Sequence, residues 1–202
     1  MHGRKNARSG FSLLEVMIVL AIIITISSFA VLNIRSSMPD ARVNSAYTTT
    51  LSTLRQAREA AIAQRRVYIV TFATPGTITL ASQNPASDAL NLTLNLPSDV
   101  SFDAEAGIPN TAGTVPDGMG LGTSTGAIDF DVNVGSGGSK VIYFWPDGSA
   151  RDLVGNLNDG VVYIARPGSL MTSRAISLRG LTGRIRGWRL RQTAGVTKWY
   201  QI

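Results

Sequence analysis

The sequence predicts an α+β fold in which a long N-terminal helix packs on a globular head of antiparallel β-strands. Residues 11–32 form an almost wholly apolar run, and helical spacing of apolar residues continues to about residue 66. From residue 67 onward, short runs of alternating apolar and polar residues are separated by Gly, Pro, Asn and Asp, which is typical of strands and turns. We therefore expect a short basic segment over 1–10, a transmembrane helix over 11–32, an amphipathic helical stalk over 33–66 and a β-rich head over 67–202.

The composition excludes the commonest catalytic sites. The 202 residues contain no Cys, and the single His is His2. Thiolate nucleophiles, disulfides, Cys- or His-ligated metals and Ser-His-Asp triads are therefore excluded. A Ser-Lys pair would have to use Lys140 or Lys198, and nothing around either residue supports one. We expect a structural or binding protein that is not an enzyme and uses no cofactor.

The net charge of +6 is concentrated at the two ends of the chain. Residues 1–10 carry +3, and residues 174–202 carry seven basic residues and no acidic one. Residues 35–145 carry seven basic and nine acidic residues, a balance of −2. Without residues 1–10, the remaining 192 residues carry +3 and contain no His. The prediction is a nearly balanced head with one cationic C-terminal edge.

The first apolar run has the properties of a membrane anchor. About 20 apolar residues cross a bilayer core of about 30 Å, and residues 11–32 contain a single charged side chain, Glu15. The basic residues before the run predict a cytoplasmic N-terminus and a translocated head. No A-x-A-like cleavage site follows the run, so the chain should stay attached. A carboxylate in a bilayer costs about 2.5–3.5 kcal/mol, which makes Glu15 a candidate functional residue.

The residues around Glu15 suggest what it does. The stretch Arg8-Ser9-Gly10-Phe11-Ser12-Leu13-Leu14-Glu15-Val16 resembles the type III signal of type IV pilins and type II secretion pseudopilins. The resemblance implies that residues 1–10 are a leader peptide, which a prepilin peptidase removes by cleaving between Gly10 and Phe11 on the cytoplasmic side, and that Phe11 is then N-methylated. It also places the family's invariant glutamate at Glu15 and implies a single-pass inner-membrane protein with a periplasmic head. Its partners would be other pilins or pseudopilins.

A physical argument supports a role of Glu15 in assembly. The new α-amine of Phe11 in one subunit would neutralise Glu15 of its neighbour. In lipid this pairing removes two costly charges only when the subunits assemble in a staggered register. Glu15 is therefore predicted to specify the register of assembly.

The predicted stalk contains a proline. Pro39 should interrupt or kink the helix near residues 37–38, and Asp40 would cap a new helical start. Beyond it, one stripe at helical spacing is predicted to pack on the head as far as about Arg65, and it consists of Tyr47, Leu51, Leu54, Arg58, Ala61 and Ile62.

The head is predicted to contain eight or nine short strands. Turns are expected at Pro75-Gly76 and over 146–149, and a long Gly-rich loop over 104–126. The predicted strands cover residues 67–72, 77–80, 90–96, 128–134, 140–145, 161–165, 174–178, 183–190 and 197–202.

Two head motifs narrow the resemblance to the GspH/FimT family of minor pilins and pseudopilins. The stretch Phe144-Trp145-Pro146-Asp147-Gly148-Ser149 resembles the family's F-x-P-D/S-G hairpin. The segment from Ile176-Ser177-Leu178 to Gly183-Arg184-Ile185-Arg186 resembles its I-x-L … G-R-x-R ending. The resemblance implies a minor pseudopilin of a type II secretion system, a structural subunit of the periplasmic pseudopilus. The alternative that it leaves open is a FimT-like type IV minor pilin that binds DNA for uptake.

The C-terminal arginines divide these two hypotheses. Arg184, Arg186, Arg189 and Arg191 are candidates for a cationic face that binds DNA phosphates, with Trp188 and Trp199 stacking on bases. Alternation puts the first pair on one strand face, and the second pair alternates with its parity shifted by one. The other interpretation is that the arginines are solvated or pair with acids of neighbouring subunits.

The head contains two weaker candidates for a ligand site. Asp129 and Asp131 share a predicted strand face and, with Asp117 or Asp103, would form a Ca²⁺ site. The alternative is a solvated acidic face, and no metal site is predicted. The Gly-rich residues 117–126 lack the G-K-[ST] ending of a phosphate-binding loop.

Overall fold

The computed structural model describes residues 12–84, 91–110, 113–120, 126–132 and 138–202, without the side chains of residues 29–37. The predicted leader, including Gly10, lies outside the described residues, as does Phe11. The chain divides into two units, Met1–Met38 and Pro39–Ile202.

The long helix α1 extends from Leu13 to Gln64. The expected interruption at Pro39 is wrong, because Pro39 lies inside the helix. A proline removes one N–H bond and crowds one carbonyl, and a long helix with intact turns on both sides tolerates that loss. The helix ends as predicted near Arg65, which has a left-handed φ of 53°. The Arg66 N–H then donates to the Ala61 carbonyl at 3.3 Å, which is a Schellman-type ending.

In the first unit, the large apolar side chains from Leu13 to Ile26 are exposed. Among the described residues, no helix has both the length and the apolarity needed to cross a membrane. The predicted membrane segment, 11–32, includes Phe11 and four side chains (29–32) that lie outside the described part.

In the second unit, α1 buries one stripe against the strands. Tyr47, Leu54 and Ala61 are buried as predicted, whereas Ile62 is 43 % exposed. Arg58 does not pack as an apolar residue but donates hydrogen bonds to the carbonyls of Gly148 and Thr182. The rest of the buried stripe has spacings of three and four and consists of Val43, Ala46, Thr50, Thr53 and Ala57.

Two five-stranded antiparallel sheets form the rest of the second unit. The first has the order β3-β2-β1-β5-β6 and is built from β1 (Tyr68–Ala73), β2 (Thr77–Ser82), β3 (Asn91–Asn95), β5 (Val141–Phe144) and β6 (Ala150–Arg151). The second has the order β10-β9-β8-β7-β4 and is built from β4 (Ile128–Asp129), β7 (Gly160–Ile164), β8 (Arg174–Arg179), β9 (Arg184–Thr193) and β10 (Val196–Gln201). Two short 3₁₀ helices are η2 (Pro116–Gly118) and η3 (Leu170–Thr172).

Strand prediction from alternation is confirmed for most of the head. The strand expected over 128–134 is the exception, because β4 contains two residues and residues 133–134 lie outside the described part. β6 was not predicted, since two residues are too few to show a period. The predicted α+β fold, a helix packed on antiparallel sheets, is confirmed.

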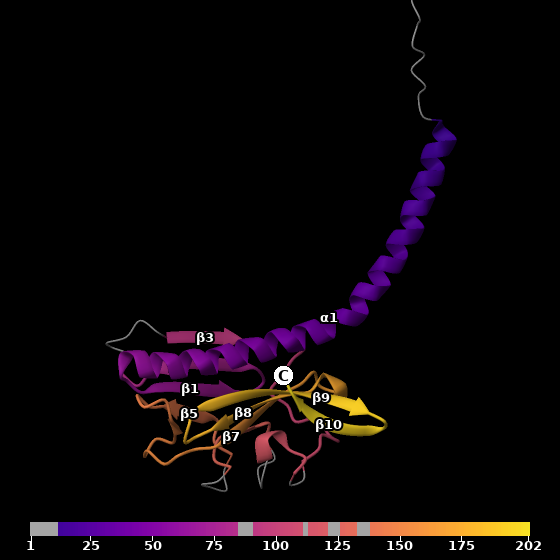
Figure 1. The fold of residues 1–202 in the computed structure, drawn as a ribbon. Coiled ribbons are helices and arrows are strands. Elements are labelled where there is room, and N and C mark those ends of the chain that lie inside the picture. The colour runs from indigo at the N-terminus through magenta and orange to yellow at the C-terminus, as the bar shows by residue number, and fades with distance from the viewer. Residues whose placement is uncertain (1–11, 85–90, 111–112, 121–125, 133–137) are drawn as a thin grey trace, which may run out of the picture. The chain divides into compact units, whose positions relative to one another are not determined.

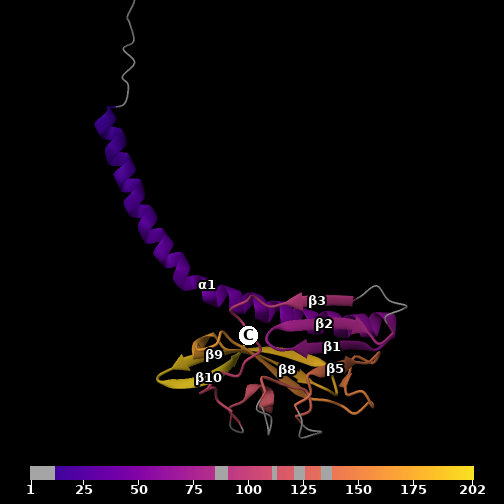
Figure 2. The same ribbon diagram turned by 180° about the vertical axis from the view of Figure 1, so that it is seen from behind.

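The core lies between α1 and the two sheets. One cluster joins side chains of α1, β1, β2, β5, β7 and β8, including Leu54, Phe72, Ile142 and Ile176. A second cluster on the opposite face of the second sheet contains Met119, Tyr163, Leu190 and Trp199. Residues of the predicted long loop cover this second cluster. Figures 1 and 2 show the second-unit part of α1 along β1, and the β9–β10 hairpin at the end where α1 enters this unit.

Candidate functional site

The four candidate arginines of β9 lie on opposite faces of the second sheet. β9 pairs with β8 in one continuous register from Arg184 to Arg189, without a bulge that would shift the parity. Arg184 and Arg186 therefore share the face of the second core cluster, and Arg189 and Arg191 share the face toward α1. The prediction of a single cationic face over all four residues is wrong for this reason.

The first pair of arginines binds an acid of the same chain. The Asp117 carboxylate is 3.1 Å from Arg186 Nη1, 3.3 Å from Arg184 Nη2 and 4.0 Å from Arg179 Nε. Arg179 also contacts Asp159 at 3.1 Å. The side chain of Asp117 is 10 % exposed and that of Arg184 46 %. We call these five residues, Arg179, Arg184, Arg186, Asp117 and Asp159, the paired end of the β8–β9 strand pair.

Asp117 reaches the arginines because its loop folds back over the sheet. It has a left-handed φ of 54° within η2, between Pro116 and Gly118, and its carbonyl accepts a hydrogen bond from Arg179 at 2.9 Å. Sequence reasoning missed this contact, since the partners are separated by more than sixty residues. The available signal was the turn-forming Pro-Asp-Gly with the one acid between residues 106 and 128.

The glycine of the G-R-x-R motif has a packing role. Gly183 has a φ of +59°, and a Cβ on it would collide with the Gly148 carbonyl and the Arg58 side chain. Gly148 is the left-handed residue of the predicted turn after Phe144, where its N–H donates to the Trp145 carbonyl at 2.8 Å. The two head motifs therefore contact each other, and Arg58 of α1 holds them together.

At the other end of β8, Arg174 is fully buried. Its Nε and Nη2 donate to Asn44 Oδ1 at 3.2 and 2.9 Å, and its Nη1 donates to the carbonyls of Thr172 and Ser173. Burial, followed by the nearby charge of Arg189, lowers the pKa of Arg174 to about 10. Arg174 therefore fixes the start of β8 to α1.

The second pair of β9 arginines faces other cations. Arg189 is opposite Arg174, and Arg191 is opposite Lys198 of β10. Like charges in directly opposite positions destabilise a sheet. Within the described part of the chain, no ion pair involves Arg189, Arg191 or Lys198, and the Arg191 guanidinium lies 5.9 Å from the centre of the Tyr200 ring. We call Arg189, Arg191 and Lys198 the unpaired end.

The two tryptophans do not form an exposed stacking surface. Trp199 is 8 % exposed, packs against Tyr163 and donates its Nε1–H to the Pro109 carbonyl at 3.2 Å. The half-buried Trp188 donates its Nε1–H to Ser177 Oγ at 2.9 Å. The expected stacking of both rings on bases is not supported by these positions.

The acidic candidates do not assemble into a cation site. The described residues contain no group of three Asp, Glu, His or Cys side chains positioned to hold a metal ion. Asp117 binds arginines, while Asp129 Oδ1 accepts the Asp131 N–H at 3.1 Å. Burial, followed by the hydrogen bond with the Asp131 side chain, raises the pKa of Asp129 to about 6. The Asp129–Asp131 pair is therefore a local loop contact, without the third acid that the Ca²⁺ hypothesis required.

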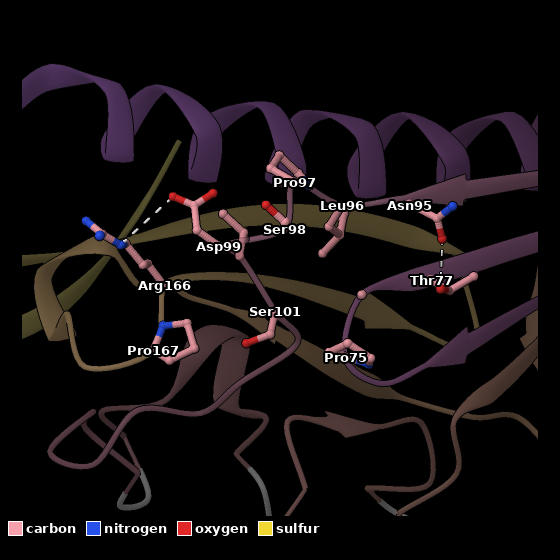
Figure 3. A pocket seen from close by; sticks show the side chains of 12 residues that line it. Pro75, Thr77, Asn95, Leu96, Pro97, Ser98, Asp99, Ser101, Arg166 and Pro167 are labelled. Atoms are coloured by element: carbon pink, nitrogen blue, oxygen red, sulfur yellow. Dashed lines mark hydrogen bonds and ion pairs between the residues drawn. The ribbon is translucent and has the colours of Figure 1, made fainter. Parts of the chain in front are cut away.

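A separate pocket of about 530 Å³ lies between the β1–β2 turn and residues 95–101. Figure 3 shows Asp99 and Arg166 facing each other at one end and Thr77 bonded to Asn95 at the other. Asp99 also contacts Arg42 of α1 at 3.1 Å. The two charged residues that line the pocket, Asp99 and Arg166, therefore neutralise each other. The pocket has no arrangement of groups suited to catalysis.

At the N-terminal end, Glu15 lies in the first turn of α1 with an exposed side chain. A family model described as the prokaryotic N-terminal methylation motif matches residues 5–31. The match places this motif at the N-terminal end of the chain, over the predicted processing site and the start of α1. The match includes Gly10 and Phe11, on which the predicted processing depends, and Glu15, on which the predicted assembly depends.

Two solved structures are similar in fold to this chain. Both are crystal structures of the type IV minor pilin FimU from Pseudomonas aeruginosa. The match to one of them has 14 % sequence identity and a TM-score of 0.44, and it covers 71 % of this chain and 85 % of the FimU chain. The other is 13 % identical with a TM-score of 0.45 and covers 76 % of this chain and 95 % of that chain. No curated protein matches the sequence.

Proposed function

We propose that this pilin-like chain is a minor pseudopilin of a type II secretion system, a structural subunit of the periplasmic pseudopilus. The observation that carries the proposal is the methylation motif over residues 5–31, whose apolar part from Leu13 onward forms the start of α1. Cleavage between Gly10 and Phe11 by a prepilin peptidase would leave the apolar segment attached and create a free α-amine. The chain would then be anchored in the inner membrane with its N-terminus cytoplasmic and its head periplasmic.

In this proposal Glu15 sets the register of assembly. An ammonium at Phe11 of one subunit neutralises the Glu15 carboxylate of the next, and the pairing is satisfied only in a staggered filament. The head contributes shape and contacts, while the work of assembly is done by a separate ATPase. Replacement of Glu15 should therefore block assembly without changing the fold of the second unit.

The test compares Glu15→Ala with Glu59→Ala. Glu59 is an exposed acid of the same helix in the second unit, so its loss controls for charge alone. We expect Glu15→Ala to remain in the membrane fraction and to be lost from sheared filaments, and Glu59→Ala to assemble normally. Entry of Glu15→Ala into filaments at the wild-type level would contradict the proposal.

The choice between secretion and DNA uptake needs a second experiment. Deletion of the gene should abolish export of secreted proteins if the chain is a pseudopilin. If it is instead a FimT-like minor pilin, deletion should abolish DNA uptake and leave secretion intact.

Two observations support the DNA-binding alternative. Arg184 is exposed, and the guanidinium groups around Asp117 outnumber its one carboxylate. Phosphate would have to compete with Asp117 for both motif arginines, which is why we favour the structural role. A gel shift of the full chain across a salt series tests the alternative. DNA binding through this motif should be weakened by Arg184→Ala/Arg186→Ala and strengthened by Asp117→Asn. Binding that neither variant changes would exclude the motif as a DNA site.

A further inference from the structure

We propose that the unpaired end, together with the face of β10 that carries Lys198, contacts the membrane surface and binds anionic phospholipid headgroups. The inference rests on the proposed function in one respect, which is that residues 11–32 anchor the chain in a bilayer. It extends that function by assigning a second membrane contact to the second unit.

The charges of this surface call for an external anion. Arg189, Arg191 and Lys198 lie on one sheet face in adjacent strands, with Arg191 and Lys198 directly opposite each other. Asp40 is the acid that lines the same hollow as Arg189 and Arg191, so two cations line that hollow with one carboxylate. At the paired end, by contrast, Asp117 and Asp159 already supply internal anions.

The apolar side chains of β10 favour a lipid surface over a purely polar partner. Val196 and Tyr200 lie on the same face of β10 as Lys198, and Ile202 follows just beyond the strand. They are 53 %, 37 % and 54 % exposed, respectively, whereas Trp199 on the opposite face is buried. Alternation of a cation with apolar and aromatic side chains is typical of segments that lie at a membrane interface.

The surface lies at the end of the second unit that is connected to the predicted anchor. Asp40 and Met171 line one hollow with Arg189 and Arg191, and the neighbouring Arg174 is bonded to Asn44 of α1. Eight residues, 33–40, separate this end from the predicted membrane segment and are helical in α1. At 1.5 Å per residue they span about 12 Å, and even a fully extended chain of this length would span about 28 Å.

This tether explains why lipid is the occupant that we propose. The attraction of basic residues to an anionic surface falls off within a Debye length of about 8–10 Å. A helical tether of about 12 Å ends slightly beyond that range, whereas a nucleic acid or an acidic protein would have to enter the narrow space beside the membrane.

The experiment uses the full chain in nanodiscs of phosphatidylcholine, with or without an equal amount of phosphatidylglycerol. Because the sequence has no cysteine, Thr193→Cys provides a unique fluorophore site beside Arg191. Val154→Cys, at a position that is 79 % exposed in the turn after β6, provides the control site. Quenching by headgroup-spin-labelled lipid reports proximity to the bilayer surface.

We expect the label at position 193 to be quenched more strongly in discs that contain phosphatidylglycerol, and this increment to be lost at high salt. Arg189→Gln/Arg191→Gln/Lys198→Gln should abolish the increment. The matched control Arg55→Gln/Arg65→Gln/Lys140→Gln removes the same charge from exposed positions elsewhere and should retain it. The label at position 154 should show no increment, and thermal unfolding by circular dichroism should be the same for both triple variants.

The outcomes separate this inference from the proposed function. Failure of the chain to co-purify with nanodiscs would contradict the anchor and, with it, both proposals. Co-purification without lipid-dependent quenching would overturn the headgroup contact alone. Absence of such quenching, combined with a DNA gel shift that the Arg189/Arg191/Lys198 variant abolishes, would instead assign the surface to nucleic acid.

Discussion

The two ends of the β8–β9 strand pair begin with the same arrangement, an arginine of one strand opposite an arginine of the other. Arg179 is opposite Arg184 at one end, and Arg174 is opposite Arg189 at the other. The first two converge on Asp117, but at the other end Arg174 is buried on neutral acceptors and Arg189 has no ion pair within the described residues. The comparison shows that cationic sequence alone does not make a cationic surface.

The difference arises from what covers each sheet face. A loop from a distant part of the chain brings Asp117 to the paired end, while α1 brings Asn44, a neutral amide, to Arg174. Arginines with an internal carboxylate contribute to the fold, and arginines without one remain free to contact a partner.

The largest effect is expected at Arg174. Arg174→Met leaves Asn44 Oδ1 and two buried carbonyls without their donor, and we expect a loss of about 3 kcal/mol of unfolding free energy. Arg179→Met, the corresponding change at the paired end, removes partly exposed ion pairs and should cost about 1 kcal/mol. Denaturant unfolding of both variants measures the difference. A smaller loss for Arg174→Met than for Arg179→Met would reverse the assignment of structural roles to the two ends.

A pH experiment extends the comparison to Asp129, an acid that forms no ion pair among the described residues. Burial raises the pKa of Asp129 to about 6 from the usual 3.8, so between pH 4 and pH 6 the native state binds more protons than the unfolded state. This group alone should make the protein about 2 kcal/mol less stable at pH 7 than at pH 4. Asp129→Asn should remove that pH dependence, as measured by unfolding at both pH values. An unchanged profile in the variant would show that Asp129 ionises normally.

Arg184 and Arg186 of the paired end depend on one loop carboxylate, that of Asp117. Asp117→Asn leaves these two arginines repelling each other and Arg179, whose ion pair with Asp159 remains, and we expect a loss of about 1 kcal/mol because the arginines are partly exposed. Added salt should reduce this loss by screening the repulsion. Thermal unfolding at low and high salt measures both effects. Stability equal to that of the wild type at low salt would show that Asp117 does not hold the arginines in solution.

The unpaired end should respond with the opposite sign and the smallest magnitude. Arg189→Gln/Arg191→Gln removes like-charge contacts, so stability should stay the same or rise by about 0.5 kcal/mol at most. Added salt should stabilise the wild type more than the variant. Clear destabilisation of the variant would mean that these arginines have internal partners after all.

The fold was largely predictable because its signals are local. Alternation located most strands, and the turn at residues 146–149 followed from Pro-Asp-Gly. Pro39 was misjudged because a rule about one residue cannot weigh the hydrogen bonds of the rest of a long helix. Ile62 was misjudged because helical spacing gives the width of a stripe but not its edges.

The site was less predictable because its contacts are not local. In the sequence, Arg184 and Arg186 alternate with a parity that is one residue out of step with that of Arg189 and Arg191. Because β8 and β9 pair in a regular register, this difference places the two pairs of arginines on opposite faces of the sheet. No sequence rule brings Asp117 across more than sixty residues to an arginine pair. The burial of Arg174 was equally hidden, because composition suggests that arginines are exposed.

The proposed function depends on how the N-terminus of the chain is processed. Intact-mass and N-terminal mass spectrometry of the chain, purified from membranes of a host that contains a prepilin peptidase, tests this most directly. The proposed processing predicts a mature chain that begins at Phe11 and carries one methyl group on its α-amine. A chain that retains residues 1–10, or one that is cut after the apolar segment, would contradict it.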